Sequence, residues 1–527
     1  MDYLLAFAAH EFANFRELEV RSLLTISGLS QDCIPEDTDW NDPYVKVKLP
    51  NDDIAARFIE RSMLIKFIYS VWATAPTFDE LLLKIPEIPL SLIDKYLYSD
   101  HSYKIIVSSV NKRIPLEDRL PYINRLIDAH VGSSAPVSLN DPDYQLHIIF
   151  EFTRAKTHQN DQTLSRVYYG REVGESSRKR ILNEFDLSKR TYLGNTTMDV
   201  CLAGIIANAC LCGPGDIVWD PFLGTGGMVL AASVWGAYGA GNDIDYALVH
   251  GIGASPKAGQ VKSIFLRCLL LSFERISLQY ARSPNHRFLN GNLMQVGKRH
   301  ADECLRANYR QYNLLSRYLD VLIADSASLD RLLRCPSTVS GLFDAIVTDP
   351  PYGVRERTCR VANEAIEKEP SMQTTMYIDE ITGGKQFAMV PNEDGLVPVP
   401  HDLPHFPHKE NYPLQEIYGD LLKLASLLLK PRGRLVFWMP VNKGKHSKSY
   451  SLPTHPRFQL ISVCEQALNR ATSRLLLVME KLLPEEADLC PNEMIDGDGV
   501  VTRTSFQGVP MHLNDFRKTH FLPKANR

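Results

Sequence analysis

Hydrophobic and polar positions follow two different patterns along the chain. In the N-terminal part, residues 15–29 carry apolar positions at helical spacing and stop at a glycine, whereas residues 43–50, 102–110 and 144–153 resemble strands. Helices and strands in mixed order are typical of an α+β module. We therefore predict a smaller α+β region at the N-terminal end.

From residue 191 onward, short apolar strands alternate with helical segments. The strands are predicted at DIVWD, GAYGAGNDID, LDVLIAD, FDAIVTD, GRLVFWMPV and SRLLLVMEKL. This alternation predicts a C-terminal α/β domain with a doubly wound, mostly parallel, Rossmann-like sheet. Ligands of such sheets bind beyond the carboxyl ends of the strands, so we expect the chemistry there.

These changes of pattern suggest four divisions of the chain. They are 1–95, an N-terminal α+β domain; 96–188, a second module with a connecting segment; 189–483, the domain with the doubly wound sheet; and 484–527, a polar tail. The third contains an irregular, proline-rich segment, 354–413. A segment of that length is usually a lid, a binding element or disorder.

The composition narrows the class of protein. The net charge is −4, so any surface that binds nucleic acid must be a local basic one. No apolar run approaches the roughly 18 residues needed to span a bilayer, and the acidic start makes a poor signal peptide. The 10 cysteines form no C-x-x-C pair, so we expect neither a zinc site nor a disulfide framework. Unpaired cysteines fit a reducing compartment, so we expect a cytoplasmic location.

A glycine turn follows the first strand of the second part, in the stretch DPFLGTGG. Gly224 and Gly226 let the backbone turn sharply and approach a ligand closely. The stretch differs from the G-x-G-x-x-G of nicotinamide enzymes, and Asp220 at the strand end would repel a phosphate. An acid beside an open glycine turn suits a cationic amino-acid group instead.

Further acids end the next two strands. Asp243, or alternatively Asp245, closes the second strand, where a carboxylate can hold ribose hydroxyls. Asp325 closes the third, where a carboxylate or a backbone group can bind an adenine amino group. The glycine turn followed by acids in this order predicts a pocket for S-adenosylmethionine.

The stretch FDAIVTDPPYGVRE ends a strand in an unusual way. Proline cannot donate to a sheet ladder, so the strand must stop before Pro350 and Pro351. Taken alone, the stretch fits an ordinary strand exit equally well. With a cofactor pocket nearby, we expect Asp349 and the Pro350 carbonyl to accept the N–H groups of an exocyclic amine, and Tyr352 to stack on the base.

A basic segment precedes the second part. Residues 164–190 carry seven lysines and arginines against four acids, including Arg178, Lys179 and Arg180. A charge run of this kind is ordinarily a solvated linker. The alternative is a face that contacts phosphate groups.

Several of these stretches together resemble the tRNA guanine-10 N2-methyltransferase family. The resemblance rests on VTDPPYGVRE, on DIVWDPFLGTGG and on KRTYLGNTTMD, and it continues upstream through VYYGREVGESSRKRILNEFDLS. It implies a THUMP domain within 96–188 and a Rossmann-like methyltransferase core within 189–483.

The resemblance implies roles for individual residues. Those that match the target-amine motif are Asp349, Pro350, Pro351 and Tyr352. Those that match the cofactor-binding positions are Asp220, Gly224 and Gly226 on the methionine side, Asp243 at the ribose and Asp325 at the adenine. Thr196 and Thr197 match a stretch beside the methionine end, where the family often has Thr-Ser.

The resemblance also implies partners. A THUMP domain would hold the tRNA, the target base would have to leave its stem, and Arg178, Lys179 and Arg180 would contact the RNA. Eukaryotic members act with a small zinc-binding activator subunit. The apolar stretch 433–441 is either a sheet edge for that subunit or an ordinary core strand.

Two other functions fit part of the sequence. Asp-Pro-Pro-Tyr also serves adenine-N6 methylation of nucleic acid, although the upstream module argues against a DNA substrate. A non-catalytic RNA-binding scaffold is the alternative from another class, but the intact acids and glycines argue against it. A nicotinamide oxidoreductase lacks its fingerprint.

Overall fold

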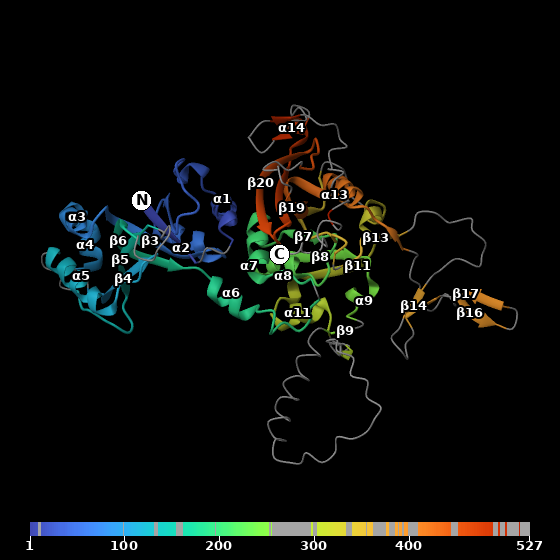
Figure 1. Ribbon diagram of the computed structural model, residues 1–527, viewed down its shortest axis with the longest axis horizontal. Coiled ribbons are helices and arrows are strands. Elements are labelled where there is room, and N and C mark those ends of the chain that lie inside the picture. The colour runs from blue at the N-terminus through green and yellow to red at the C-terminus, as the bar shows by residue number, and fades with distance from the viewer. Residues whose placement is uncertain are drawn as a thin grey trace, which may run out of the picture. The chain divides into compact units, whose positions relative to one another are not determined.

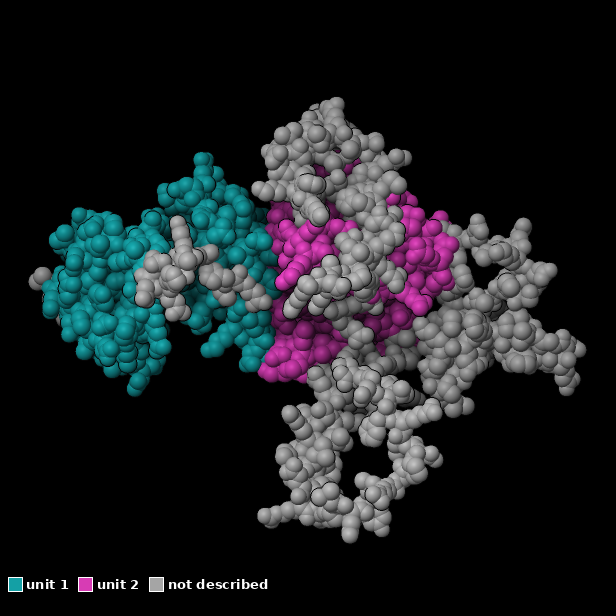
Figure 2. Space-filling view, viewed as in Figure 1, with its two compact units in different colours: residues 1–183 teal, residues 184–527 magenta. Residues whose placement is uncertain are grey.

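The computed structural model describes most of the chain. The described residues are 1–8, 12–97, 100–130, 135–153, 162–194, 196–251, 254–255, 297–298, 303–333, 340–354, 356–361, 376–378, 385–387, 389–392, 395–398, 409–443, 452–487, 494–495, 501–502 and 516. They form two compact units, residues 1–183 and 184–527 (Figure 2).

The N-terminal unit is built on a six-stranded sheet in the order β2-β1-β3-β6-β5-β4. All neighbours are antiparallel except β4 and β5. The strands are β1 (Asp2–Phe7), β2 (Tyr44–Lys48), β3 (Ile65–Ala75), β4 (Tyr103–Val110), β5 (Tyr144–Phe152) and β6 (Leu164–Glu175). The helices are α1 (Arg16–Ile26), α2 (Asp52–Glu60), α3 (Phe78–Lys84), α4 (Leu90–Leu97), α5 (Leu116–Ala129) and α6 (Arg178–Glu184), which crosses the unit boundary. The mixed α+β region predicted from the sequence is confirmed.

Three apolar clusters lie among the described residues of this unit, and the smallest of them is formed by Leu4, Ala6, Tyr69, Ile149 and Tyr168; the other two lie under the helices. One of these two lies where α1 and α2 pack on β1 to β3, and the other where α3, α4 and α5 pack on β3 to β6 (Figure 1). Helix α1 is anchored by Glu19, whose buried carboxylate accepts hydrogen bonds from the backbone N–H groups of Met63 and Leu64 at 2.7 and 2.9 Å. The proposed division of this region at residue 95 stays a prediction. Strands from both sides of residue 95 share one sheet.

The C-terminal unit is built on a seven-stranded sheet in the order β11-β8-β7-β12-β19-β21-β20. The first five strands are parallel, and β21 and β20 are antiparallel additions. The strands are β7 (Ile217–Asp220), β8 (Tyr238–Asp243), β11 (Tyr318–Ile323), β12 (Phe343–Thr348), β19 (Leu429–Asn442), β20 (Phe458–Ala467) and β21 (Thr472–Lys481). This is the doubly wound sheet that the alternating pattern predicts.

Helices join and cover these strands. They are α7 (Val200–Ala209), α8 (Gly227–Val234), α9 (Tyr246–Val249), α11 (Leu305–Gln311), α12 (Leu329–Leu332), α13 (Leu414–Leu428) and α14 (Pro484–Ala487). The apolar face of α13 packs on Phe437 and other buried residues of the sheet. Strand β19 pairs along both edges, with β12 and β21, and residues 433–441 are buried throughout. The interpretation of 433–441 as a sheet edge for a partner is therefore wrong, and the stretch is a core strand.

The segment 354–413 begins and ends in a small ladder. Strand β13 (Cys359–Val361) pairs antiparallel with β18 (Lys409–Asn411). Between them the structure describes two hairpins, β14 (Met376–Ile378) with β15 (Lys385–Phe387), and β16 (Met389–Asn392) with β17 (Gly395–Pro398). Most of the rest of this segment, and most of the predicted tail 484–527, lies outside the described residues.

Two features are absent from the described residues. None of the helices there is long and apolar enough to cross a membrane. Within the same residues, no group of three or more histidine, cysteine, aspartate or glutamate side chains is arranged to hold a metal ion.

Candidate active site

Four acids meet at the carboxyl edge of the parallel strands. Asp220 is the last residue of β7 and Asp243 the last residue of β8. Asp349 follows β12 directly, and Asp325 follows β11 by two residues. Because these strands are neighbours in the order β11-β8-β7-β12, the four acids lie along one edge, where the sequence pattern predicted them.

The glycine turn lies between β7 and α8 and has the backbone geometry that requires glycine. Gly224 and Gly226 have φ angles of 55° and 69°, in the left-handed region. A Cβ on Gly226 would lie 2.5 Å from the Leu305 side chain, whereas one on Gly224 would meet nothing within 4 Å. The turn is therefore packed behind Gly226 and open in front of Gly224.

Asp220 is fully buried and only partly satisfied. Its Oδ1 accepts hydrogen bonds from the Thr348 hydroxyl at 2.8 Å and from the Phe222 N–H at 3.0 Å. Its Oδ2 has no hydrogen-bond partner among the described residues. Burial raises the pKa of Asp220 to about 7. A cationic group at Oδ2 would favour the charged carboxylate, so this residue fits the amino-acid end of S-adenosylmethionine.

Asp243 ties the second strand to the glycine turn. Its two carboxylate oxygens accept hydrogen bonds from the N–H groups of Gly224 and Asp245, each at 2.9 Å. Burial raises the pKa of Asp243 to about 6, against those two hydrogen bonds. Of the two acids that the sequence left open, Asp243 is thus the one bonded to the turn.

Asp325 caps the short 3₁₀ helix that follows β11. It accepts hydrogen bonds from the N–H of Ala327 at 3.0 Å and from the N–H of Val361 at 2.6 Å. The second bond ties β13, at the start of the segment 354–413, to the cofactor side of the sheet. Asn242 joins the same region, because its side-chain amide donates to the carbonyls of Pro221 and Ala324.

The two threonines border different parts of this edge. The Thr197 hydroxyl lies 3.0 Å from the hydroxyl of Thr225, inside the glycine turn. The Thr196 hydroxyl donates to Glu356, in the loop that follows the Asp-Pro-Pro-Tyr stretch. The YLGNTTMD stretch is therefore in contact with both the glycine turn and the target-amine loop.

Asp349 and Tyr352 form a compact elbow after β12. The Tyr352 hydroxyl donates to Oδ1 of Asp349, and Nη1 of Arg474 lies 2.8 Å from Oδ2. Pro350 is buried and Pro351 half-buried, so the elbow is held rigidly. The Tyr352 ring packs edge-on against Phe516, with ring centroids 6.0 Å apart.

Three residues of this edge were missed from the sequence: Arg474, Thr348 and Asn242. Thr348 and Asn242 occupy strand positions that look like ordinary core. Arg474 lies near the start of β21, next to a run of buried apolar residues, and a charge at such a position was the available signal. Its partner Asp349 is 125 residues away, so no local pattern could pair them.

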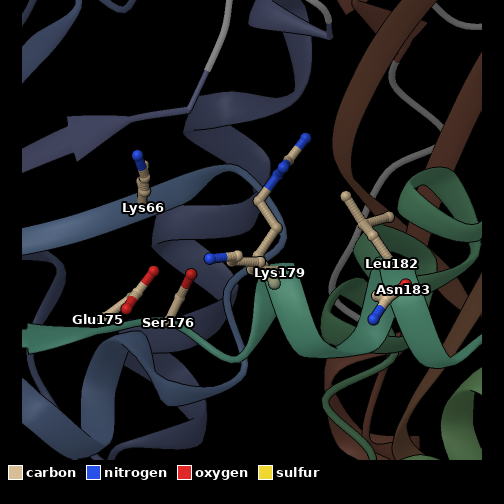
Figure 3. Close-up of a pocket in the computed structure, with 7 residues that line it drawn as sticks. Lys66, Glu175, Ser176, Lys179, Leu182 and Asn183 are labelled. Carbon is tan, nitrogen blue, oxygen red and sulfur yellow. The ribbon is translucent and has the colours of Figure 1, made fainter.

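The basic residues predicted to bind RNA lie in the N-terminal unit, on α6. Lys179 and Arg180 are exposed, whereas Arg178 donates through Nε to the Met63 carbonyl at 2.7 Å. Lys179 borders a pocket of about 360 Å³ (Figure 3). That pocket is lined by Lys66, Glu175, Ser176, Arg178, Lys179, Leu182 and Asn183.

Comparison with known proteins identifies the family. Residues 1–178 match the model of the Tmrp11 THUMP N-terminal domain. The tRNA (guanine(10)-N(2))-methyltransferase TRMT11 of Xenopus laevis is 31% identical over 480 residues, which cover 91% of this chain and 84% of that protein. The TRMT11 proteins of Bos taurus and Homo sapiens are 32% and 31% identical, each over 91% of this chain and 88% of the relative. The chain belongs to the TRMT11 family.

Membership of the TRMT11 family confirms the resemblance inferred from the motifs. It also confirms the predicted enzyme class, a tRNA (guanine-N2)-methyltransferase, and the predicted cofactor, S-adenosylmethionine. Among solved structures, TrmN from Thermus thermophilus aligns over 92% of this chain and 100% of its own, at 15% identity and a TM-score of 0.36. That similarity is too weak to carry an argument.

The raised pKa of Asp220 predicts a pH-dependent stability. Between its ordinary value and about 7, folded Asp220 holds a proton that the unfolded chain has lost, so its contribution to stability falls as pH rises through this window. Asp220→Asn lacks this loss and keeps an acceptor for Thr348. Without cofactor, we expect the Tm of the variant minus the Tm of the wild type to increase as pH rises from about 5 to 8.

Thermal unfolding over this pH range provides the measurement. The matched control is Asp320→Asn, because Asp320 is an exposed acid on β11. A Tm difference that is independent of pH for Asp220→Asn would contradict the prediction.

Proposed function

We propose that this protein transfers a methyl group from S-adenosylmethionine to the exocyclic N2 of guanosine 10 in tRNA. The observation that carries the proposal is the bond between Thr348 and Asp220. It joins the strand that ends in the target-amine elbow to the strand that ends in the cofactor turn. Methyl donor and acceptor would then meet at one edge of the sheet.

The cofactor would be held by the residues around the glycine turn. Asp220 would bind the cationic amino group, with Thr196 and Thr197 beside the methionine end. Gly224 and Gly226 would let the backbone approach it, Asp243 would accept from the ribose hydroxyls, and Asp325 would lie at the adenine. When bound, S-adenosylmethionine supplies an electrophilic methyl group on a sulfonium.

The target amine would be held by the elbow. The lone pair of an exocyclic amine is delocalised into its ring, so the nitrogen is a poor nucleophile. Asp349 and the Pro350 carbonyl would accept its two N–H groups, which directs the lone pair toward the methyl group. The Asp349 carboxylate would also stabilise the positive charge that develops on nitrogen. Pro351 would keep the elbow extended, and Tyr352 would offer a flat face to the base.

The tRNA would be bound by the N-terminal unit. Support comes from its match to a THUMP N-terminal domain model and from the exposed basic side chains on α6. Lys179 and Arg180 would contact phosphates, and Arg178 would contribute its charge while its Nε holds the Met63 carbonyl. The target base would leave its stem to reach the elbow at Tyr352.

A small zinc-binding activator subunit would complete the enzyme. With β19 inside the sheet, the edge strands left for such a partner are β11 and β20. Both carry exposed large apolar side chains, Leu319 and Ile323 on β11 and Ile461 and Val463 on β20. Exposed apolar residues on a sheet edge favour addition of a partner strand.

The catalytic proposal predicts a large effect of Asp349→Asn. The variant loses the negative charge but keeps the size of the side chain, so we expect turnover to fall by roughly 10²–10³-fold, as for other losses of a transition-state group. Cofactor affinity should change little. The measurement is transfer of labelled methyl from S-adenosylmethionine to unmodified tRNA, followed by nucleoside analysis.

The same strand offers the control. Asp344→Asn changes an acid near the start of β12, away from the elbow. Oδ1 of Asp344 lies 2.7 Å from Nζ of Lys430. Near-normal turnover in Asp349→Asn would refute the role of the elbow. Labelled N6-methyladenosine in place of N2-methylguanosine would favour the other enzymatic function, and cofactor binding without any transfer would favour a scaffold.

The RNA-binding proposal predicts a change in salt dependence. Lys179→Gln with Arg180→Gln removes two exposed charges without disturbing the Arg178 anchor. We expect weaker tRNA binding, with a slope of log K against log[salt] that is shallower by about 2. Filter binding at several salt concentrations measures it, with Lys48→Gln and Arg57→Gln as a doubly neutralised control in the same unit. An unchanged slope would return α6 to the solvated-linker interpretation.

The activator proposal predicts that one sheet edge is required for assembly. We expect the wild-type chain to co-purify with a co-expressed zinc-binding activator, and either Ile323→Glu or Ile461→Glu to abolish co-purification. A charge on the contacted edge would have to be buried without a partner. The edge that tolerates its glutamate serves as the control for the other. Co-purification that survives both substitutions would refute docking at these edges.

A further inference from the structure

Arg474 holds the carboxylate that the proposed function assigns to the target amine. Its Nη1 lies 2.8 Å from Oδ2 of Asp349, with the two side chains 13% and 23% exposed. A charge-assisted hydrogen bond of this length in a largely water-excluded place is stronger than a surface ion pair. The contact crosses from β21 to the end of β12, two strands away in the sheet.

The guanidinium is fixed by contacts from three further segments. Its Nε donates to Oε1 of Gln466 on β20 at 2.8 Å. Its central carbon lies 4.0 Å from the centroid of the Trp438 ring on β19. Its Nη2 lies 3.6 Å from the sulfur of Met198, which precedes α7. A planar, stacked and hydrogen-bonded guanidinium has little freedom left, so it presents Nη1 to Asp349 in one direction.

The surroundings of Asp349 require a cation. Burial raises the pKa of this carboxyl group, and the charge of Arg474 opposes that rise. A protonated carboxyl would donate one of its hydrogen bonds and could not stabilise positive charge on an amine. The charged and titratable groups that face Asp349 are Arg474 on β21, Tyr352 and Glu356 in the following loop, Asp220 at the end of β7, and Tyr418 on α13.

We infer that Arg474 is a positioning residue for methyl transfer: it keeps the Asp349 carboxylate ionised and oriented toward the target amine. The inference rests on the proposed function. Among the groups that face Asp349, the others are acids or phenols, and Arg474 supplies the opposing positive charge. The competing explanation is that Arg474 only staples β19, β20 and β21 together.

A pH profile separates the two explanations. In the full-length protein, with the activator co-expressed if activity requires it, Arg474→Met keeps most of the side-chain length but removes charge and hydrogen bonds. We expect single-turnover formation of N2-methylguanosine to fall about 10²-fold at pH 7.5. We also expect the acid limb of the rate to move up by about one pH unit or more, because Asp349 loses its cation. The dissociation constant of S-adenosylmethionine should stay within about threefold, since the proposed role concerns the amine and not the cofactor.

Two further variants complete the test. Arg474→Lys restores the charge without the planar fork, so we expect the acid limb to return toward the wild-type position while the plateau rate stays reduced. Arg432→Gln is the matched control, because the exposed Arg432 forms ion pairs with Glu480 and Glu486 near the other end of β19 and β21. It should leave the rate and the pH profile unchanged.

The outcomes are distinct. A wild-type rate in Arg474→Met, or a lower rate with an unmoved acid limb and a lower Tm, would overturn the inference in favour of the staple. If Arg474→Met does not fold, Arg474→Lys decides: a full wild-type plateau rate would overturn the positioning role. A wild-type protein that forms no N2-methylguanosine would refute the proposed function itself.

Discussion

Burial of carboxyl groups at the ends of parallel strands is the constraint on which the candidate site depends. A buried carboxylate is costly unless its oxygens are hydrogen-bonded or meet a cation. Asp243 and Asp325 each accept hydrogen bonds from two backbone N–H groups. Asp349 accepts hydrogen bonds from the Tyr352 phenol and the Arg474 guanidinium. Among the residues that the structure describes, Asp220 has hydrogen-bond partners at one oxygen only. The proposed function assigns the cationic group of the cofactor to the remaining oxygen, Oδ2.

The spacing of the sheet connects the two halves of the reaction. Strands β7 and β12 are direct neighbours, and adjacent strands lie about 4.8 Å apart. The bond from Thr348 to Asp220 crosses that gap, immediately before Asp349 in the sequence. In the proposed function, the separation between a methyl donor at the glycine turn and an amine at the elbow would thus be set by backbone pairing, which is stiffer than a loop. Positioning of this kind contributes to rate because the reacting atoms need not search for each other.

How much the sequence predicts depends on how local each feature is. The sheet type follows from short alternating patterns of apolar strands and helices. The turn follows from glycines such as Gly224, whose positive φ favours glycine, and the acids follow from their position at the strand ends. The partner of Asp349 does not follow, because Arg474 comes close only after β21 has been added antiparallel to β19. For the same reason, residues 433–441 are apolar whether their strand is central or at an edge, and only the pairing with β12 and β21 decides.

The same reasoning applies to the C-terminal tail, which the sequence presents as a polar appendage. Phe516 belongs to that tail, yet it is buried in the main apolar cluster of the C-terminal unit and touches the ring of Tyr352. An aromatic neighbour packed edge-on restricts the tilt of the Tyr352 ring. Tyr352 is therefore bonded at its hydroxyl to Asp349 and contacted at its ring by a residue 164 positions further along the chain. The ring of Tyr352 is thus held by one contact inside its own stretch and by one from the distant tail, which explains why the Asp-Pro-Pro-Tyr stretch alone cannot specify its own geometry.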